Sequence, residues 1–141
     1  MRLWPTGAIV AGCLLLTSGT LLAARPQSVL SGVYTTEQAA AGEAIYYDRC
    51  AECHGDDLRG IERAPALVGG QFLDAWKGKP LRDLLEQIEN MPPDEPAVVS
   101  TAEAADVLAF LLYAIGIPSG STALPADRVQ LGEITFEPPK P

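Results

Sequence analysis

Residues 50–54 have the sequence Cys-Ala-Glu-Cys-His, and this stretch decides the interpretation of the whole chain. The pattern C-x-x-C-H is the one through which haem is bonded covalently to a polypeptide. The thiols of Cys50 and Cys53 are spaced so that each takes one vinyl group of a porphyrin. His54 follows directly, where its imidazole is placed to bind the iron, and it is the only histidine in the sequence. The stretch therefore predicts one haem c, attached covalently through two thioethers.

A second iron ligand is expected from methionine. Besides the initiator, the chain has one methionine, Met91, which lies in an Asn-Met-Pro-Pro turn at residues 90–93. Its thioether is a soft donor, and ligation by histidine and methionine raises the reduction potential and suits electron transfer. The alternative is a methionine that fills a gap in the core. Lys77 and Lys79 are poorer candidates because a lysine must first lose a proton, so we expect His54 and Met91 to bind the metal.

The first 24 residues are expected to be a signal peptide or signal anchor. Arg2 is followed by 22 consecutive uncharged residues, which is typical of an export leader and predicts a periplasmic protein. Cleavage after Ala23 or Ala24 fits imperfectly, because a leucine stands three residues before either bond. A helix of that length, about 33 Å at about 1.5 Å per residue, would span a bilayer as an anchor. The stretch Val-Ala-Gly-Cys that ends at Cys13 also resembles the box before a lipidated cysteine, so three fates stay open.

Composition limits the classes of partner. The chain has 141 residues and a formal net charge of −8, with 10 basic and 18 acidic side chains. So few lysines and arginines argue against nucleic acid as a partner. An acidic surface allows steering toward a basic patch on a partner protein, although solubility alone explains it as well. With two of three cysteines assigned to haem, no structural disulfide is expected.

Apolar spacing and capping residues predict an all-α domain. The expected helices are, in chain order, residues 36–49, 71–77, 80–90 and 101–115. Thr35 with Gln38, and Ser100 with Glu103, have the spacing of capping boxes at the first and last of these helices. The Gly- and Pro-rich stretch 55–70 predicts an irregular loop.

The same pattern divides the chain into four parts. These are the leader over residues 1–24, a linker over 25–36, a haem domain over 37–116 and an extended Pro/Gly-rich tail over 117–141. The tail contains one short strand-like run, residues 133–136. We find no internal repeat and no second domain.

Residues 37–116 resemble a class I cytochrome c of the short bacterial monohaem kind. The resemblance rests on the haem motif, the single downstream Met-Pro and a helix on each side. It implies an all-α class I fold of about four helices packed around one covalently attached haem, with His54 and Met91 as axial ligands. In this family a proline shortly after the motif accepts the second N–H of the histidine through its carbonyl, and Pro65 occupies that place. This agrees with the general habit of metal-bound histidines.

The resemblance also covers the helices that flank the haem. The family crosses its first and last helices with a glycine at the close contact and aromatic residues beside it. Gly42, Tyr46 and Cys50 share one face of the first helix, and Val107 and Phe110 match the facing positions on the last. A glycine inside a helix costs about 1 kcal/mol relative to alanine, which close backbone approach would explain.

Three further residues are weaker candidates. Family members often hold a haem propionate with a tryptophan or an arginine, and Trp76, Arg59 and Arg63 are available here. An indole in the core and solvated arginines explain these residues equally well. We therefore do not count them among the expected site residues.

Two other interpretations of the cysteine pair are disfavoured. A thioredoxin-like C-x-x-C would begin a helix after a strand, whereas this pair follows a predicted helix. A zinc site would need a fourth ligand, and only Cys13 in the leader is left over.

Three functions remain to be compared. The first is a one-electron carrier that is not itself an enzyme and works between periplasmic or membrane redox partners, with a dehydrogenase as donor and a cytochrome or oxidase as acceptor. The alternative is the cytochrome subunit of a larger dehydrogenase complex, built on a quinoprotein or molybdenum enzyme, over which the tail would lie. The third is a haem enzyme or gas sensor with an open iron position, against which Met91 argues.

Overall fold

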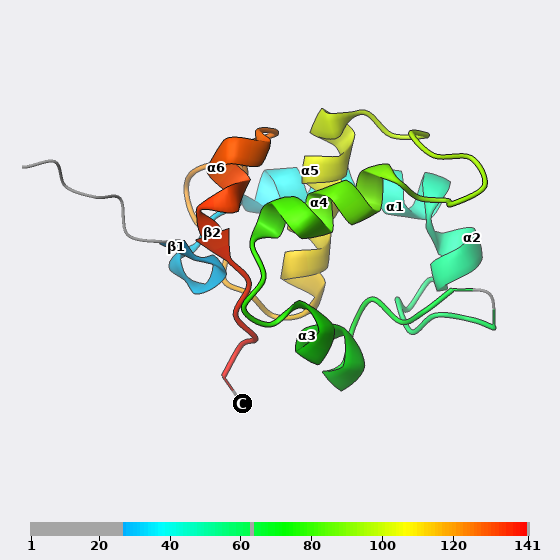
Figure 1. Ribbon diagram of the computed structural model, residues 1–141, viewed down its shortest axis with the longest axis horizontal. Helices are drawn as coiled ribbons and strands as arrows, with labels where there is room; N and C mark the ends of the chain where they lie inside the picture. The colour runs from blue at the N-terminus through cyan, green and yellow to red at the C-terminus, as the bar shows by residue number, and fades with distance from the viewer. Residues whose placement is uncertain (1–26, 63, 141) are drawn as a thin grey trace, which may run out of the picture.

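The computed structural model describes residues 27–62 and 64–140 and is mostly helical (Figure 1). Its elements follow in the order β1 (Gln27–Ser28), the 3₁₀ helix η1 (Val29–Ser31), α1 (Thr36–Arg49), α2 (Ala51–His54), α3 (Gly70–Trp76), α4 (Leu81–Glu89), α5 (Thr101–Ala114), α6 (Arg128–Gly132) and β2 (Ile134–Thr135). The all-α prediction is confirmed at this level. The described residues contain six α-helices where about four are expected, because α2 and α6 are single short turns that apolar spacing does not reveal.

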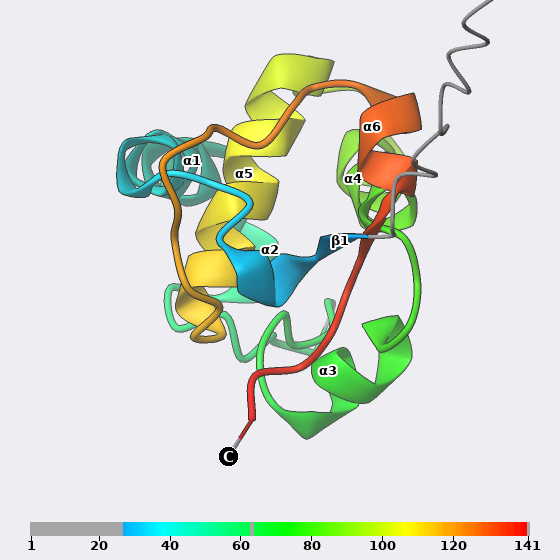
Figure 2. The ribbon, with the colours of Figure 1, turned by 90° about the vertical axis from the view of Figure 1, so that its left-hand side faces the viewer.

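Helices α1 and α5 cross at the centre of the fold, where Figure 2 shows α1 nearly end-on beside α5. Gly42 lies at the crossing. A Cβ atom placed on it would be 1.8 Å from the carbonyl oxygen of Asp106, so no larger residue fits. The rings of Tyr46 and Phe110 pack alongside, with centroids 5.3 Å apart. The expected close approach of the first and last helices is therefore present.

Replacing Gly42 with alanine is expected to lower the free energy of unfolding by about 1–3 kcal/mol, because the added methyl forces the two backbones apart. Gly70, at the start of α3, has no neighbouring atom within 4 Å of the position that a Cβ would take. Gly70→Ala is thus the matched control and should leave stability unchanged or raise it slightly. Chemical denaturation of both variants checks this, and equal stabilities would refute the tight crossing.

The caps of the long helices are formed by the expected residues, with one difference. Ser100 and Glu103 make a full capping box at α5. At α1 the Thr35 hydroxyl accepts the N–H of Gln38, but the Gln38 side chain does not return to the cap. Its amide instead pairs with the backbone of Leu124, donating to the carbonyl oxygen at 3.0 Å and accepting the N–H at 2.7 Å. The helix thereby anchors the C-terminal segment rather than its own first turn.

Both ends of the described chain pack against the helical core, a feature that Pro/Gly composition does not anticipate. Strands β1 and β2 pair in parallel, with Gln27 opposite Ile134, and α6 lies beside α4 (Figures 1 and 2). Apolar side chains explain this, because those of Val29, Val33, Tyr34, Leu124, Leu131, Ile134 and Phe136 are buried. The parts of residues 25–36 and 117–141 that the structure describes thus pack together against the helical core. The four-part division of the chain remains a prediction.

The predicted leader, residues 1–24, lies outside the described residues. Within residues 27–62 and 64–140, no helix combines the length and the apolar character needed to cross a bilayer.

Candidate functional site

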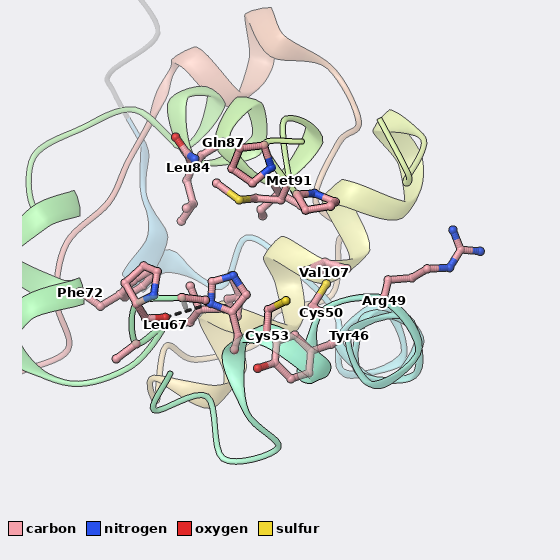
Figure 3. A pocket seen from close by; sticks show the side chains of 18 of the residues that line it. Tyr46, Arg49, Cys50, Cys53, Leu67, Phe72, Leu84, Gln87, Met91 and Val107 are labelled. Atoms are coloured by element: carbon pink, nitrogen blue, oxygen red, sulfur yellow. Dashed lines mark hydrogen bonds between the residues drawn. The ribbon is translucent and has the colours of Figure 1, made fainter. Parts of the chain in front are cut away.

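A cavity of about 620 Å³ opens between the helices, and all five expected site residues line it. Its walls are mainly apolar and come from α3, α4, α5, the loop before α3 and the loop between α4 and α5; the lining residues include Leu67, Phe72, Leu84, Val99, Val107 and Leu111. Figure 3 shows Met91 and Leu84 on one wall and Cys50 and Cys53 on the facing wall. A volume in this range suits an organic cofactor.

The two thiols are presented by one helical turn. Cys50 is the N-cap of α2, and the backbone N–H groups of Cys53 and His54 donate to its carbonyl oxygen at 3.1 and 2.9 Å. Residues three apart in a helix share a face, so both sulfur atoms are directed to the cavity wall (Figure 3). Burial raises the pKa of the Cys50 thiol, which the positive charge of Arg49 offsets in part. A disulfide-exchanging C-x-x-C needs the opposite shift.

His54 is oriented by the carbonyl of Pro65. The Nδ1 atom lies 2.9 Å from this oxygen. Since a carbonyl only accepts hydrogen bonds, Nδ1 carries a hydrogen, and in the neutral imidazole this leaves the lone pair on Nε2. The ring that lines the cavity is therefore in the tautomer that a metal requires.

The loop that carries Pro65 is shaped by Gly60. Gly60 has φ of +75°, and its N–H donates to the carbonyl oxygen of His54 at 2.8 Å. A Cβ on it would lie 2.5 Å from the carbonyl oxygen of Ala64 and 2.7 Å from the carbonyl carbon of Pro65. The position of the Pro65 carbonyl thus depends on the absence of a side chain at residue 60.

Gly60→Ala is expected to displace Pro65 and weaken its hydrogen bond to His54, which lowers the basicity of the imidazole. In the haem-loaded protein the reduction potential should rise. Gly69→Ala is the control, because Gly69 has a similar φ of +84° but nothing within 4 Å of its Cβ position. If both variants gave the wild-type reduction potential, the orienting role of Pro65 would be refuted.

Met91 stands at the C-terminal end of α4, where its N–H donates to the carbonyl oxygen of Ile88 at 3.1 Å. We define the Met91 loop as residues 90–99, which join α4 to α5. The loop turns back on itself, since Glu95 donates to the carbonyl of Pro92 and Ala97 to that of Glu89. The thioether is half-buried and faces the cavity (Figure 3).

The donor set determines what the cavity holds. The described residues include no group of three or more His, Cys, Asp or Glu side chains that would bind a bare metal ion. The protein offers two donors here, an imidazole nitrogen and a thioether sulfur. A metal bound by them would need its other ligands from a macrocycle. Two thiols beside them suit covalent attachment of that macrocycle, and the apolar walls suit a porphyrin. These residues fit haem c.

The three weaker candidates for a propionate contact differ in whether they line the cavity. Trp76 lines the cavity, with the Nζ atom of Lys79 4.9 Å from the ring centroid. Arg59 does not line it; its side chain is 80% exposed and pairs with Asp57 at 3.6 Å. Arg63 lies outside the described residues.

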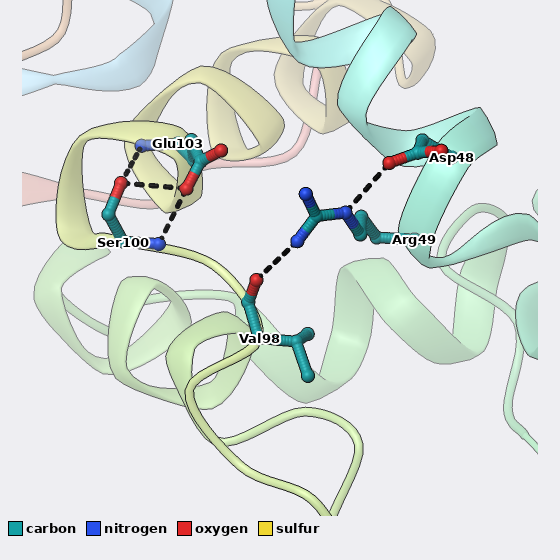
Figure 4. A network of polar contacts seen from close by, with 5 residues as sticks. All are labelled: Asp48, Arg49, Val98, Ser100 and Glu103. Carbon is teal, nitrogen blue, oxygen red and sulfur yellow. Dashed lines mark hydrogen bonds and ion pairs between the residues drawn. The ribbon is translucent and has the colours of Figure 1, made fainter.

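Arg49 is a site residue that the sequence does not reveal. It lines the cavity, and its Nη1 atom donates to the carbonyl oxygen of Val98 at 2.6 Å (Figure 4). A charged residue before the haem motif has no local signal for a partner 49 positions away, so only the fold identifies the contact.

Comparisons with known proteins agree with the geometry. Residues 37–111 match the family model described as cytochrome C oxidase, cbb3-type, subunit III. The chain is 29% identical over 99 residues to the Cbb3-type cytochrome c oxidase subunit CcoP of Rubrivivax gelatinosus. The match covers 69% of this chain and 31% of that protein, so the chain spans about a third of the relative's length. No solved structure matches the chain.

Proposed function

The chain belongs to the cbb3-type cytochrome c oxidase subunit III family and is a c-type cytochrome of electron transport; from this premise we propose that it carries one electron at a time on a single covalently bound haem c. The observation that supports the proposal best is the convergence at one cavity. His54, with Nε2 left free by the bond to Pro65, lines the same apolar space as both thiols and Met91.

The proposed role of each residue follows from its place. His54 would bind the iron through Nε2, and Met91 would supply a second ligand through sulfur. Cys50 and Cys53 would hold the porphyrin through thioethers. A bound haem would supply the Fe(III)/Fe(II) couple, and the apolar walls would exclude water from it. With both protein ligands bound, no position on the iron would remain for a substrate, which disfavours a peroxidase or gas sensor.

For the redox partners, a second candidate is favoured by the comparisons. The family and the relative are named as subunits of a cytochrome oxidase, whereas no observation favours the dehydrogenase alternative. We propose that this domain, exported to the periplasm, works as a cytochrome subunit or direct partner of an oxidase complex. In the C-terminal segment, Leu124, Leu131, Ile134 and Phe136 are buried in the chain's own core, so these side chains are not available to a partner.

Two measurements on the holoprotein test the function. A potentiometric titration should follow a one-electron curve, and the reduced protein should not bind carbon monoxide at neutral pH. Rapid carbon monoxide binding would support an open-site haem enzyme instead. Co-purification of the full chain with oxidase activity from solubilised membranes supports the oxidase partnership, and co-purification with a dehydrogenase contradicts it.

A further inference from the structure

We infer that Arg49 is a positioning residue that clamps the Met91 loop to helix α1 and so keeps the methionine sulfur on the iron. The inference rests on the proposed ligation by His54 and Met91. It assigns a function to a side chain that neither binds the porphyrin covalently nor ligates the metal.

The geometry of Arg49 is that of a two-point clamp. Arg49 is the last residue of α1 and directly precedes Cys50. Its Nε atom donates to Oδ2 of Asp48 at 2.7 Å, which fixes the plane of the guanidinium (Figure 4). Its Nη1 atom then reaches the carbonyl oxygen of Val98 at 2.6 Å. A charged, oriented donor makes a stronger bond than a neutral one.

Within the part of the chain that the structure describes, the Met91 loop has no other hydrogen bond in this direction, although Val98 and Val99 pack against the core. Its other backbone bonds close the loop on itself or on α4; the donors are Asn90, Met91, Glu95 and Ala97. Among the hydrogen bonds of residues 27–62 and 64–140, the bond from Arg49 to Val98 is the one that joins the loop to α1 or to the haem motif. Two residues later, the Ser100 capping box fixes the start of α5. Arg49 thus secures the stretch of loop before that cap.

The clamp matters because a thioether is a neutral and weak ligand. It stays on the iron only while the loop holds it there, and opening of the loop competes with binding. A role in holding a haem propionate is disfavoured by position. Arg49 neighbours Cys50, and the vinyl groups that cysteines attack lie on the opposite half of a porphyrin from its propionates.

The test compares Arg49→Met with Arg49→Lys and with Arg82→Met in the haem-loaded protein. Arg82 is the matched control, because it also pairs with an aspartate adjacent in the sequence, Asp83 at 3.5 Å, yet does not line the cavity. Two signals are read: the far-red absorption band of ferric iron bound to a thioether, and the rate of carbon monoxide binding to ferrous iron. Loss of a hydrogen bond from a charged donor at a half-exposed site should increase the population of the open loop about tenfold.

We expect Arg49→Met to bind carbon monoxide about tenfold faster than wild type. As the pH is raised, this variant should lose the far-red band at a lower pH than wild type does. Arg49→Lys should come close to wild type in both signals, and Arg82→Met should match wild type. If Arg49→Met folds and matches wild type in both signals, the clamp is wrong. Should it fail to fold, Arg49→Gln, whose side chain is shorter, replaces it under the same criteria. A wild-type protein without the band would overturn the ligation itself, which separates the two failures.

Discussion

Replacing Met91 with alanine will lower the reduction potential and open the iron to added ligands. Alanine has no donor atom, so the position on the iron that Met91 would fill becomes free for water, carbon monoxide or cyanide. Axial ligands set haem potentials over a span of roughly 0.8 V, and loss of a methionine should cost on the order of 0.1 V or more. Spectroelectrochemistry and carbon monoxide titration measure the two effects.

Met91→His is the companion variant that separates the identity of the ligand from the presence of one. An imidazole refills the axial position, so carbon monoxide should again be excluded while the potential stays low, because the soft sulfur donor is gone. If Met91→Ala kept the wild-type spectrum and potential, Met91 would be a packing residue and the ligand assignment would be wrong.

Replacing both Cys50 and Cys53 with alanine will abolish covalent haem. The thioethers are the only proposed covalent links, so the pigment should leave the double variant entirely in acid-acetone, whereas the wild-type protein should keep it. Without haem, a cavity of about 620 Å³ would stand among Leu67, Phe72 and Leu84. Empty volume in a core is destabilising, so we also expect little folded double variant.

The third cysteine provides the control for this experiment. Cys13→Ala changes only the predicted leader and should leave haem content per molecule equal to that of wild type. Intact mass of each purified protein gives the result directly, and a double variant that still carried the mass of a haem would contradict covalent attachment through this pair.

Local signals predicted much of the helical framework. The start of α5 follows from Ser100 and Glu103, since a capping box acts within three residues and needs no tertiary partner. Gly42 is a different case. A glycine inside a helix lowers stability, and local patterns give no reason for it. The resemblance explained it by the close approach of two helices, which the contact with Asp106 confirms.

Contacts between residues far apart in the chain could not be predicted from local sequence patterns. Gln38 has the spacing of a capping box, yet its amide binds the backbone of Leu124, because the C-terminal segment competes successfully for the same donor and acceptor. The packing of the N- and C-terminal segments was not predicted for a similar reason. Ile134 and Phe136 lie in the strand-like run predicted at 133–136, but their burial depends on β1 and on helices formed far away in the sequence. The contact of Arg49 with Val98 belongs to the same class.

The site itself was predicted as a set of residues, and the structure adds how they meet. All five line one cavity, and the Nδ1 atom of His54 lies 2.9 Å from the carbonyl oxygen of Pro65. Their roles as haem attachments and iron ligands stay predictions that the variants above test.

X-ray absorption at the iron edge of the oxidised and reduced holoprotein tests the central claim most directly. The account predicts five nitrogen neighbours, four from the porphyrin and one from His54, together with one sulfur from Met91 in both oxidation states. A first shell of nitrogen and oxygen atoms without sulfur, or an iron with only five neighbours, would contradict it.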